Sequence, residues 1–277
     1  MSRLIERVSA MSYLWMGDKP NSIKKLIKPN TDEHQARYRF AERLAYSLPG
    51  IDTIIDAASG SGWGTHYLAR NTNSTKLIGI DIDPQAIIEA RKFFSHYKVS
   101  YITADLLKPE VINKNRSADL FVCFETLEHF LPEQAEVLLR NIGMMTAKNG
   151  SLAVSSPNRL LFSPYSTTEG KSWYPFHPIE YTSDELITVL EKTGWKIDGI
   201  YGQRFVDKDE YLKIARALYF IRKFAHIKHL PPDHVLSRLP FALLQRYAAL
   251  RSDAEVHKVE NEKSLSPIYL TAVCSHG

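Results

Sequence analysis

Short apolar runs alternate with amphipathic segments through most of the chain. The apolar runs are rich in β-branched residues, as buried strands are, and lie at 53–58, 76–83, 98–105, 118–125 and 151–158. A helix-like segment follows most of them, such as the one that begins with Pro84. Since strands that alternate with helices build a mostly parallel sheet with helices on both faces, the pattern predicts an α/β fold.

The two ends of the chain depart from this alternation. Residues 1–50 have a helical pattern, and we expect an N-terminal helical lid there, next to a single domain that spans 51–277. Two further strands are expected at 195–205 and 267–276. The segment between them, about 206–262, has the pattern of helices, so we expect a helical insertion within that domain.

The composition narrows the class of protein. Of 277 residues, 44% are hydrophobic and 24% are charged, which is typical of a globular domain. No run approaches about 18 uncharged apolar residues, and Arg3, Glu6 and Arg7 interrupt the first segment, so we expect neither a membrane span nor a signal peptide. Cys123 and Cys274 lie in strand-like runs, which favours buried thiols over a disulfide. We expect a cytoplasmic protein.

The net charge of +4 is unevenly distributed along the chain. Residues 204–251 carry ten Lys or Arg and four Asp or Glu, and 211–230 carry five basic residues and no acid. On a helical wheel an apolar stripe forms, made of Ile214, Leu218, Ile221 and Ala225. The basic residues cluster elsewhere with two aromatic rings: Lys213, Arg216, Lys223 and Lys228 with Phe220 and Phe224. This pattern suits an anionic membrane surface or RNA phosphates, and equally a helix whose stripe packs on the domain while its charges are solvated.

A glycine-rich loop follows the first strand, in the stretch IDAASGSGWGTHYLA at 55–69. Its glycines, Gly60, Gly62 and Gly64, do not have the G-x-G-x-x-G spacing of dinucleotide-binding loops, and no lysine of a phosphate-binding loop follows them. An aspartate ends each of the first three strands, namely Asp56, Asp81 and Asp105. Such acids line the crevice of open α/β sheets, where Asp81 is at the spacing expected for ribose hydroxyls and Asp105 could reach an adenine amino group.

Five motifs in order resemble those of class I S-adenosylmethionine-dependent methyltransferases: IIDAASGSGWG, LIGIDID, ITADLL, DLFVCFETLEHF and KNGSLAVSSPNR. The resemblance covers about 33–205 and the last strand. It implies a Rossmann-like, seven-stranded sheet in the order 3-2-1-4-5-7-6, with strand 7 antiparallel. It also implies S-adenosylmethionine as the cofactor.

The resemblance assigns roles around that cofactor. Gly60 and Gly62 would lie against its methionine part, with Asp56 just ahead of them. Asp81 would bind the ribose, and Ile82 next to it would also contact the cofactor. Asp105 and Leu106 would frame the adenine, and Phe124 would line the pocket. The upstream segment DEHQARYRFA resembles one in which His34, Arg37 and Tyr38 close over the cofactor carboxylate or the substrate. The alternative for that segment is a surface helix with an ordinary charged face.

A second constellation follows the fourth strand. FETLEHF supplies Glu125, Glu128 and His129, and FHPIEYTSDEL supplies His177 and Glu180. Two carboxylates and two imidazoles could form a metal site, which would acidify a poorly nucleophilic hydroxyl group. Without a metal, His129 is the first candidate for general base and His177 the second, with Glu128 beside them. A purely structural role stays open.

The E-x-x-E-H pattern resembles two metal-dependent groups, the ubiquinone-pathway O-methyltransferases and the small-RNA 2′-O-methyltransferases. By that resemblance Glu125, Glu128, His129 and His177 would be the ligands of Mg²⁺ or Mn²⁺.

The acceptor is less well defined. The overall arrangement most resembles methyltransferases of surface-polysaccharide and glycan assembly, so a sugar hydroxyl, free or lipid-linked, is the leading expectation. An RNA 2′-hydroxyl, a phenolic small molecule and a non-catalytic binding protein remain alternatives. A nicotinamide oxidoreductase fits poorly because of the glycine spacing. A peripheral contact with anionic membrane through 211–230 stays open, and a nucleic-acid partner is the less expected alternative.

Overall fold

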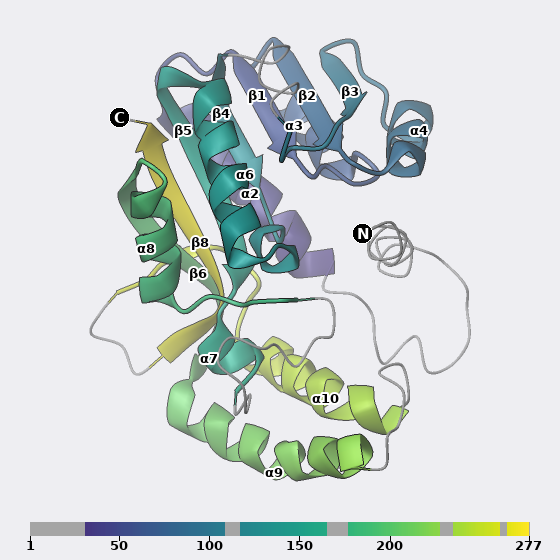
Figure 1. The fold of residues 1–277 in the computed structure, drawn as a ribbon, viewed down its shortest axis with the longest axis vertical. Helices are drawn as coiled ribbons and strands as arrows, with labels where there is room; N and C mark the ends of the chain where they lie inside the picture. Colours follow the sequence, from purple (N-terminus) through teal and green to yellow (C-terminus); the bar gives the residue numbers. More distant parts are fainter. Residues whose placement is uncertain (1–30, 109–116, 165–176, 228–234, 261–264, 277) are drawn as a thin grey trace.

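The computed structural model describes residues 31–108, 117–164, 177–227, 235–260 and 265–276. These residues form an eight-stranded sheet in the order β3-β2-β1-β4-β5-β8-β6-β7 (Figure 1). The strands are β1 (Thr53–Ala57), β2 (Lys76–Asp81), β3 (Val99–Thr103), β4 (Ala118–Cys123), β5 (Thr146–Pro157), β6 (Trp195–Asp207), β7 (His257–Lys258) and β8 (Leu265–His276).

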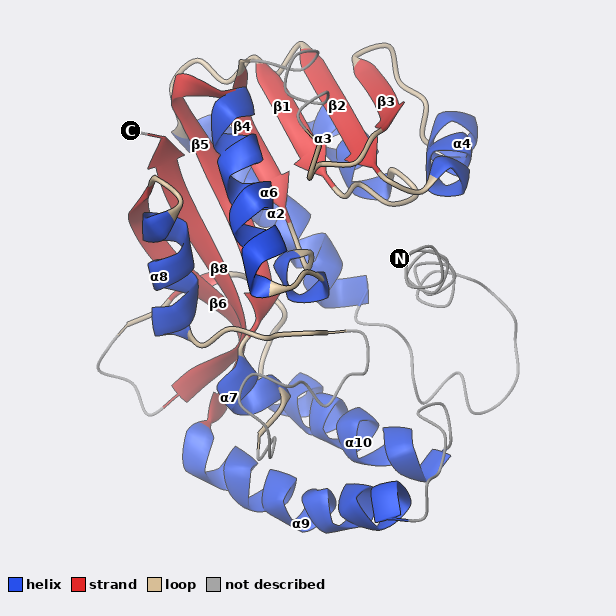
Figure 2. Ribbon diagram, in the orientation of Figure 1, coloured by secondary structure: helices blue, strands red, loops and turns tan. Residues whose placement is uncertain are grey.

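Helices lie between most of the consecutive strands, as the alternation predicts, although none is described between β3 and β4 (Figure 2). They are α2 (Thr31–Ser47), α3 (Trp63–Asn71), α4 (Pro84–Phe93), the 3₁₀ turn η1 (Leu127–His129), α6 (Pro132–Met145), α7 (Arg159–Phe162), α8 (Ser183–Lys192), α9 (Lys208–Ile227) and α10 (Val235–Arg251). Local signals set several ends. Pro84 is in the first turn of α4, and Thr182 and Glu185 form a capping box at the start of α8.

The pairing of the strands confirms a mostly parallel sheet with an antiparallel last strand. The strands from β1 to β5 pair in parallel, and β8 is antiparallel to both β5 and β6. The expected count of seven strands is wrong among the described residues. The two-residue β7 pairs with the outer edge of the long β6, and a strand of two residues has too little pattern to be predicted.

The helices cover both faces of the sheet. Ile54 and Ile55 are neighbours in β1, so their side chains point to opposite faces. Ile55 belongs to a buried cluster with α6 and α8, and Ile54 to a cluster with α2 and α3. Tyr38 and Ala41 of α2 are buried in the second cluster. The described part of the expected N-terminal lid therefore belongs to the core of the domain, and residues 1–30 lie outside the described part.

The expected insertion is a helical hairpin of α9 and α10 at the far end of the long strands β6 and β8 (Figure 1). Asp207 ends β6 and accepts a hydrogen bond from the backbone N–H of Glu210, at 2.8 Å, which starts α9. A third buried cluster joins the hairpin to β6, α7 and β8. Cys123 and Cys274 are buried free thiols, as expected. Among the described residues, none of the helices combines the length and the apolar character that crossing a membrane requires.

Candidate functional site

The glycine loop joins β1 to α3 and is anchored to the end of β2. The backbone N–H of Gly60 donates to Asp81 Oδ2 at 2.8 Å, and that of Ser59 donates to the carbonyl of Ile80 at 2.9 Å. Gly62 precedes α3 with φ of 88°, and a Cβ there would lie 2.7 Å from Ala90 Cβ. The Tyr101 hydroxyl donates to the carbonyl of Gly62 at 3.0 Å. The loop thus has a fixed shape against β2, β3 and α4.

Asp81 is at the carboxyl end of β2, where its carboxylate closes the loop that follows. Its Oδ1 accepts the N–H of Asp83 at 2.9 Å, and burial raises the pKa of its carboxyl group. Next to it, Ile82 keeps 44% of its surface exposed, although it is a large apolar residue. An acid and an exposed aliphatic side chain in one loop suit the hydroxyls and the flat ring of a nucleoside.

The other residues predicted to bind the cofactor lie just beyond β3 and β4. Asp105 follows β3 and accepts the N–H of Leu107 at 3.0 Å. Leu106 and Phe124 are almost fully buried, and the carbonyl of Leu106 accepts a hydrogen bond from Asn141 at 2.8 Å. Because the carboxyl ends of parallel strands share one edge of the sheet, these residues and Asp81 lie along the same edge.

Asp56 differs from the expectation that it lines the crevice. Its carboxylate is buried inside β1, with the Tyr38 hydroxyl donating to both oxygens at 3.0 Å and the Thr65 hydroxyl to Oδ2 at 2.6 Å. Burial raises the pKa of Asp56 to about 7. The ring of Tyr38 lies directly over Gly64, so the third glycine of the loop makes room for this ring. Asp56 therefore connects α2, β1 and α3, a role that the sequence pattern did not indicate.

Replacing Gly64 with alanine is expected to lower the free energy of unfolding by roughly 1–3 kcal/mol, the usual cost of overpacking a filled core. A Cβ at this position would lie 1.9 Å from Cζ of Tyr38, and both residues are buried. Urea denaturation measures the loss. The control is a double-mutant cycle with Tyr38→Ala, in which alanine at position 64 should cost little once the ring is gone. Equal costs in both backgrounds would contradict this packing.

Arg37 of α2 is buried and connects three elements. Its Nη1 donates to Gln203 Oε1 at 2.7 Å and lies 3.7 Å from Glu125 Oε1. Glu125 also accepts a hydrogen bond from the Ser155 hydroxyl at 2.8 Å. One turn earlier in α2, Glu33 forms a buried ion pair with Arg204. These contacts fix α2 to β6 and direct the carboxylate of Glu125 towards Arg37.

Glu128, His129 and His177 come together beyond the ends of β4 and β5. One potential ligand atom from each lies within 4.8 Å of those of the other two. Glu128 and His129 come from η1, and His177 follows the segment after α7. Glu128 is only 1% exposed, and its Oε2 has no hydrogen-bond partner among the described residues. Burial, together with the nearby carboxylates of Glu125 and Glu180, raises the pKa of Glu128 well above its usual value.

Glu180 contacts this cluster through His177. Its Oε1 lies 2.9 Å from Nδ1 of His177, and its side chain is fully buried. The ring of His177 also contacts two other rings, His129 at 5.0 Å and Phe162 at 5.7 Å between centroids. With Nδ1 engaged by a carboxylate, Nε2 is the ring nitrogen suited to a metal ligand, the usual arrangement of a metal-binding histidine. The sequence pattern placed Glu180 nearby but gave it no such role.

The structure brings together three of the four residues predicted as metal ligands. Glu125 is outside the cluster found among the described residues, because its backbone has a φ of 50° and its carboxylate is engaged by Ser155 and Arg37. The donor set is therefore one carboxylate oxygen and two imidazole nitrogens. Such a set suits Mn²⁺ or another transition ion better than Mg²⁺, which prefers oxygen ligands.

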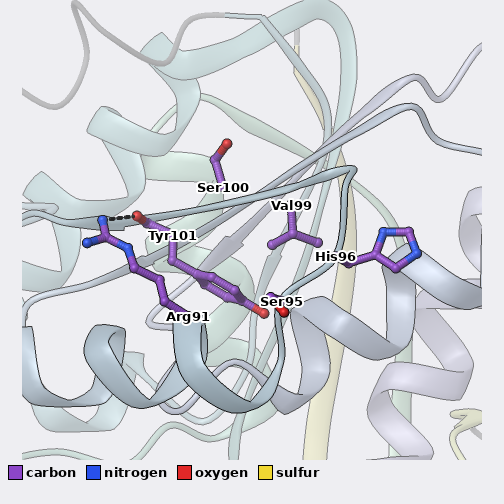
Figure 3. Close-up of a pocket in the computed structure, with 6 residues that line it drawn as sticks. All are labelled: Arg91, Ser95, His96, Val99, Ser100 and Tyr101. Atoms are coloured by element: carbon purple, nitrogen blue, oxygen red, sulfur yellow. Dashed lines mark hydrogen bonds between the residues drawn. The ribbon is translucent and has the colours of Figure 1, made fainter.

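Two shallow hollows lie away from this edge of the sheet. One, of about 290 Å³, lies between α4 and the start of β3 (Figure 3). There the Arg91 guanidinium donates to the carbonyl of Tyr101 at 2.6 Å, so its charge serves the local structure. The other, of about 310 Å³, lies between α3 and Phe94. Neither is lined by the acids or by the histidine cluster.

Comparison with known proteins agrees with this arrangement. Residues 54–150 match the model of a methyltransferase domain. The chain is 31% identical over 163 residues to a protein of Mycobacterium tuberculosis described as a probable S-adenosylmethionine-dependent methyltransferase, Rv3030. This match covers 58% of the chain and 54% of the relative, so the chain spans about half the length of the curated relatives it matches.

Solved structures extend the likeness of the fold to nearly the whole chain. The methyltransferase domain of bacterial CtHen1 is 14% identical, with a TM-score of 0.56 over 88% of this chain and 99% of the other. The [4+2]-cyclase SpnF is 18% identical, with a TM-score of 0.53 over 87% and 82%. At these identities the likeness shows the fold alone, and a fold that also serves a cyclase does not name the reaction.

Proposed function

We propose that the chain is an S-adenosylmethionine-dependent O-methyltransferase that acts on a hydroxyl group of a sugar or glycan, assisted by a divalent metal ion. The match of residues 54–150 to a methyltransferase domain, and the likeness to a probable S-adenosylmethionine-dependent methyltransferase, support the reaction and the cofactor. The metal ion is proposed because Glu128, His129 and His177 form a cluster in which Oε2 of Glu128 is buried without a hydrogen-bond partner among the described residues. A buried carboxylate in that state is costly unless a cation binds it.

The residues of the glycine loop and of the strand ends hold the cofactor in this proposal. Asp81 would accept hydrogen bonds from the two ribose hydroxyls while it keeps Gly60 in place. Ile82 would cover one face of the adenine, and Asp105 would bind its amino group. Gly62 gives α3 an N-terminus without a side-chain cap, which leaves backbone N–H groups for the cofactor carboxylate. S-adenosylmethionine supplies the electrophilic methyl group.

Methyl transfer to oxygen requires an acceptor hydroxyl that loses its proton. Glu128, His129 and His177 would hold a divalent ion, whose Lewis acidity would lower the pKa of a neighbouring hydroxyl group. Glu180 keeps the ring of His177 in one orientation. Without an ion, His129 is the candidate base, because it is the partly exposed member of the cluster and can accept the hydroxyl proton. In both cases a C–O bond forms as the methyl–sulfur bond breaks.

The choice of a sugar hydroxyl rests on the resemblance of the sequence to methyltransferases of glycan assembly. The cluster also lies next to the α9–α10 hairpin, since Phe162 stacks on His177 and contacts Phe241 of α10, with the centroids of the two phenylalanine rings 4.9 Å apart. An acceptor bound at the cluster would therefore lie beside that hairpin.

Calorimetry tests the proposal in two steps. S-adenosylhomocysteine is titrated into chelator-treated protein. Mn²⁺ is then titrated into the resulting complex and into the variant Glu128→Ala/His177→Ala. The control is Glu191→Gln, at an exposed position of α8. We expect S-adenosylhomocysteine to bind tightly to all the proteins. We expect one Mn²⁺ to bind per chain in the wild type and in Glu191→Gln, and none in the double variant. Ligand binding without a metal event would contradict the metal and leave His129 as base. Absence of both would contradict the methyltransferase assignment.

The acceptor is identified by transfer of a labelled methyl group. Lipid-linked and nucleotide-linked sugars are compared with a small RNA and a catechol, in the presence and absence of Mn²⁺. Label on the sugar hydroxyl supports the proposal. Label only on RNA or on the phenol would overturn the sugar assignment while leaving the cofactor and metal parts intact.

Replacing Glu180 with glutamine is expected to weaken Mn²⁺ binding about 10- to 100-fold, the usual effect of losing the carboxylate behind a metal-binding histidine. Glutamine keeps the size of the side chain, so the affinity for S-adenosylhomocysteine should not change. Calorimetry measures the affinity for Mn²⁺ and the affinity for S-adenosylhomocysteine separately, and Glu191→Gln is again the control. Unchanged metal affinity would show that the contact between Glu180 and His177 serves the fold alone.

A further inference from the structure

We propose that the outer faces of α9 and α10 form a docking surface for a membrane rich in anionic lipid. The proposal does not depend on the acceptor, because it rests on the charge and exposure of the hairpin itself. From 211 to 251 the sequence contains eight Lys or Arg and a single acid, Asp233, which lies outside the described residues.

The helix α9 has a packed face and an outer face. Tyr211 and Ala215 are buried in the cluster that joins the hairpin to β8, with Leu212, Ile214, Leu218 and Tyr219 packed beside them. The outer face is exposed and follows a helical spacing: Lys213, Arg216, Ala217, Phe220, Ile221 and Lys223. Phe220 is 64% exposed. Ile221 was expected in the packed stripe but is exposed, since the packed face is centred on Ala215.

Apart from Arg246 and Arg251, the exposed side chains described in α10 are aliphatic. Leu244 and Ala248 are buried against the hairpin core. On the other side Leu243 and Leu250 are 37% and 75% exposed, and Arg246 lies between them in the helical spacing. Solvent-facing helices normally place charged residues at such positions. A run of aliphatic side chains with one Arg and no acid instead suits contact with an apolar layer.

Together the two outer faces combine large apolar side chains with cations. The nearest acids in the hairpin, Asp209 and Glu210, are in the first turn of α9, and Glu210 lies 3.6 Å from Arg251. Lipid headgroups with negative charge attract the cations, and the acyl boundary accepts the apolar side chains. This combination favours lipid over RNA, because Ile221, Leu243 and Leu250 offer no ring on which a base could stack.

The hairpin is also in contact with the candidate site. Phe241 of α10 packs on Phe162 of α7, and Phe162 stacks on His177. Docking of the hairpin would therefore hold the histidine cluster close to the lipid surface. A hydroxyl group carried by a lipid headgroup or a lipid-linked sugar would reach the cluster without leaving the membrane.

Co-sedimentation with vesicles tests the docking surface. Vesicles of phosphatidylglycerol and phosphatidylcholine are compared with vesicles of phosphatidylcholine alone. We expect binding to the anionic vesicles that weakens with salt, and a loss of at least about tenfold in Lys213→Glu/Arg216→Glu and in Phe220→Ser/Leu250→Ser. All variants should bind S-adenosylhomocysteine like the wild type, which shows that the domain is folded and separates this test from that of the proposed function.

Matched controls lie elsewhere on the surface. Phe93→Ser removes an aromatic ring that is also 64% exposed, and Lys148→Glu/Lys196→Glu reverses two exposed charges outside the hairpin. Neither control should change vesicle binding. Absence of vesicle binding in the wild type, or equal losses in the controls, would overturn the proposal. The proposal would also be overturned if the hairpin variants bound vesicles like the wild type but no longer bound a single-stranded RNA. The same holds if they bound vesicles like the wild type but sedimented as monomers where the wild type is a dimer.

Discussion

Replacing Asp81 with alanine is expected to weaken the binding of S-adenosylhomocysteine about 100-fold. Two effects add. The carboxylate that would accept hydrogen bonds from the ribose is lost, and hydrogen bonds to a charged group contribute about 1.5–3 kcal/mol. The N–H groups of Gly60 and Asp83 lose their acceptor at the same time, so the glycine loop loses its fixed shape. Calorimetry gives the affinity, and circular dichroism shows whether the fold is kept.

The matched control for Asp81 is at the opposite end of the sheet. Asp119 also accepts two backbone N–H groups, those of Asp52 and Thr53, at 3.0 and 2.8 Å. Asp119→Ala thus removes a similar set of hydrogen bonds without touching the candidate crevice. We expect a modest loss of stability and an unchanged affinity. If Asp81→Ala and Asp119→Ala had the same affinity as the wild type, the crevice at the ends of β1, β2 and β3 would not be the cofactor site.

Replacing Glu128 with glutamine is expected to have opposite effects on stability and on metal binding. In metal-free protein at neutral pH the glutamine should raise the free energy of unfolding by about 1–3 kcal/mol, because the side chain keeps its shape but brings no charge into the interior. With Mn²⁺ in excess the wild type should gain stability, by about 2.7 kcal/mol at a hundredfold excess over the dissociation constant. The variant should gain none.

A buried carboxylate with a partner provides the contrast. Glu33 is also almost fully buried, but it is paired with Arg204, so Glu33→Gln should cost stability, by about 3–5 kcal/mol, since an uncompensated guanidinium remains inside. Thermal melts of the wild type and of Glu128→Gln, each with Mn²⁺ and with chelator, compare the four stabilities. Glu33→Gln is melted beside them with chelator. A Glu128→Gln variant that is less stable than the wild type without metal would mean that the carboxylate serves the fold rather than a cation.

The sequence predicted the framework of the fold because that framework depends on local patterns. The runs of β-branched residues became β1 to β5, and the glycine loop and Asp81 are at adjacent strand ends as expected. The resemblance to methyltransferases supplied what periodicity cannot, the place of the last strand between β5 and β6.

The contacts that shape the site could not be predicted, because they join residues that are far apart in the sequence or depend on a single torsion angle. Tyr38 reaches Asp56 only because α2 packs over Gly64, and Arg37 meets Gln203 across 166 residues. Glu125 matches the metal-binding motif, yet its left-handed backbone directs it to Ser155 and Arg37. A motif gives residue types and spacing, and the direction of a side chain follows from the backbone around it.

The strand order has a consequence for synthesis on the ribosome. The strand β8 comes after the other strands in the chain, yet it lies between β5 and β6 and pairs with both over most of its 12 residues. While Leu265–His276 are still in the exit tunnel, β1 to β5 can already form a sheet, whereas β6 and the hairpin have no strand that joins them to it among the described residues. The nascent chain therefore passes through a stage in which the residues of the hairpin core lack their cover. Exposed apolar surface of this kind favours aggregation or the binding of a chaperone until translation delivers the strand that closes the sheet.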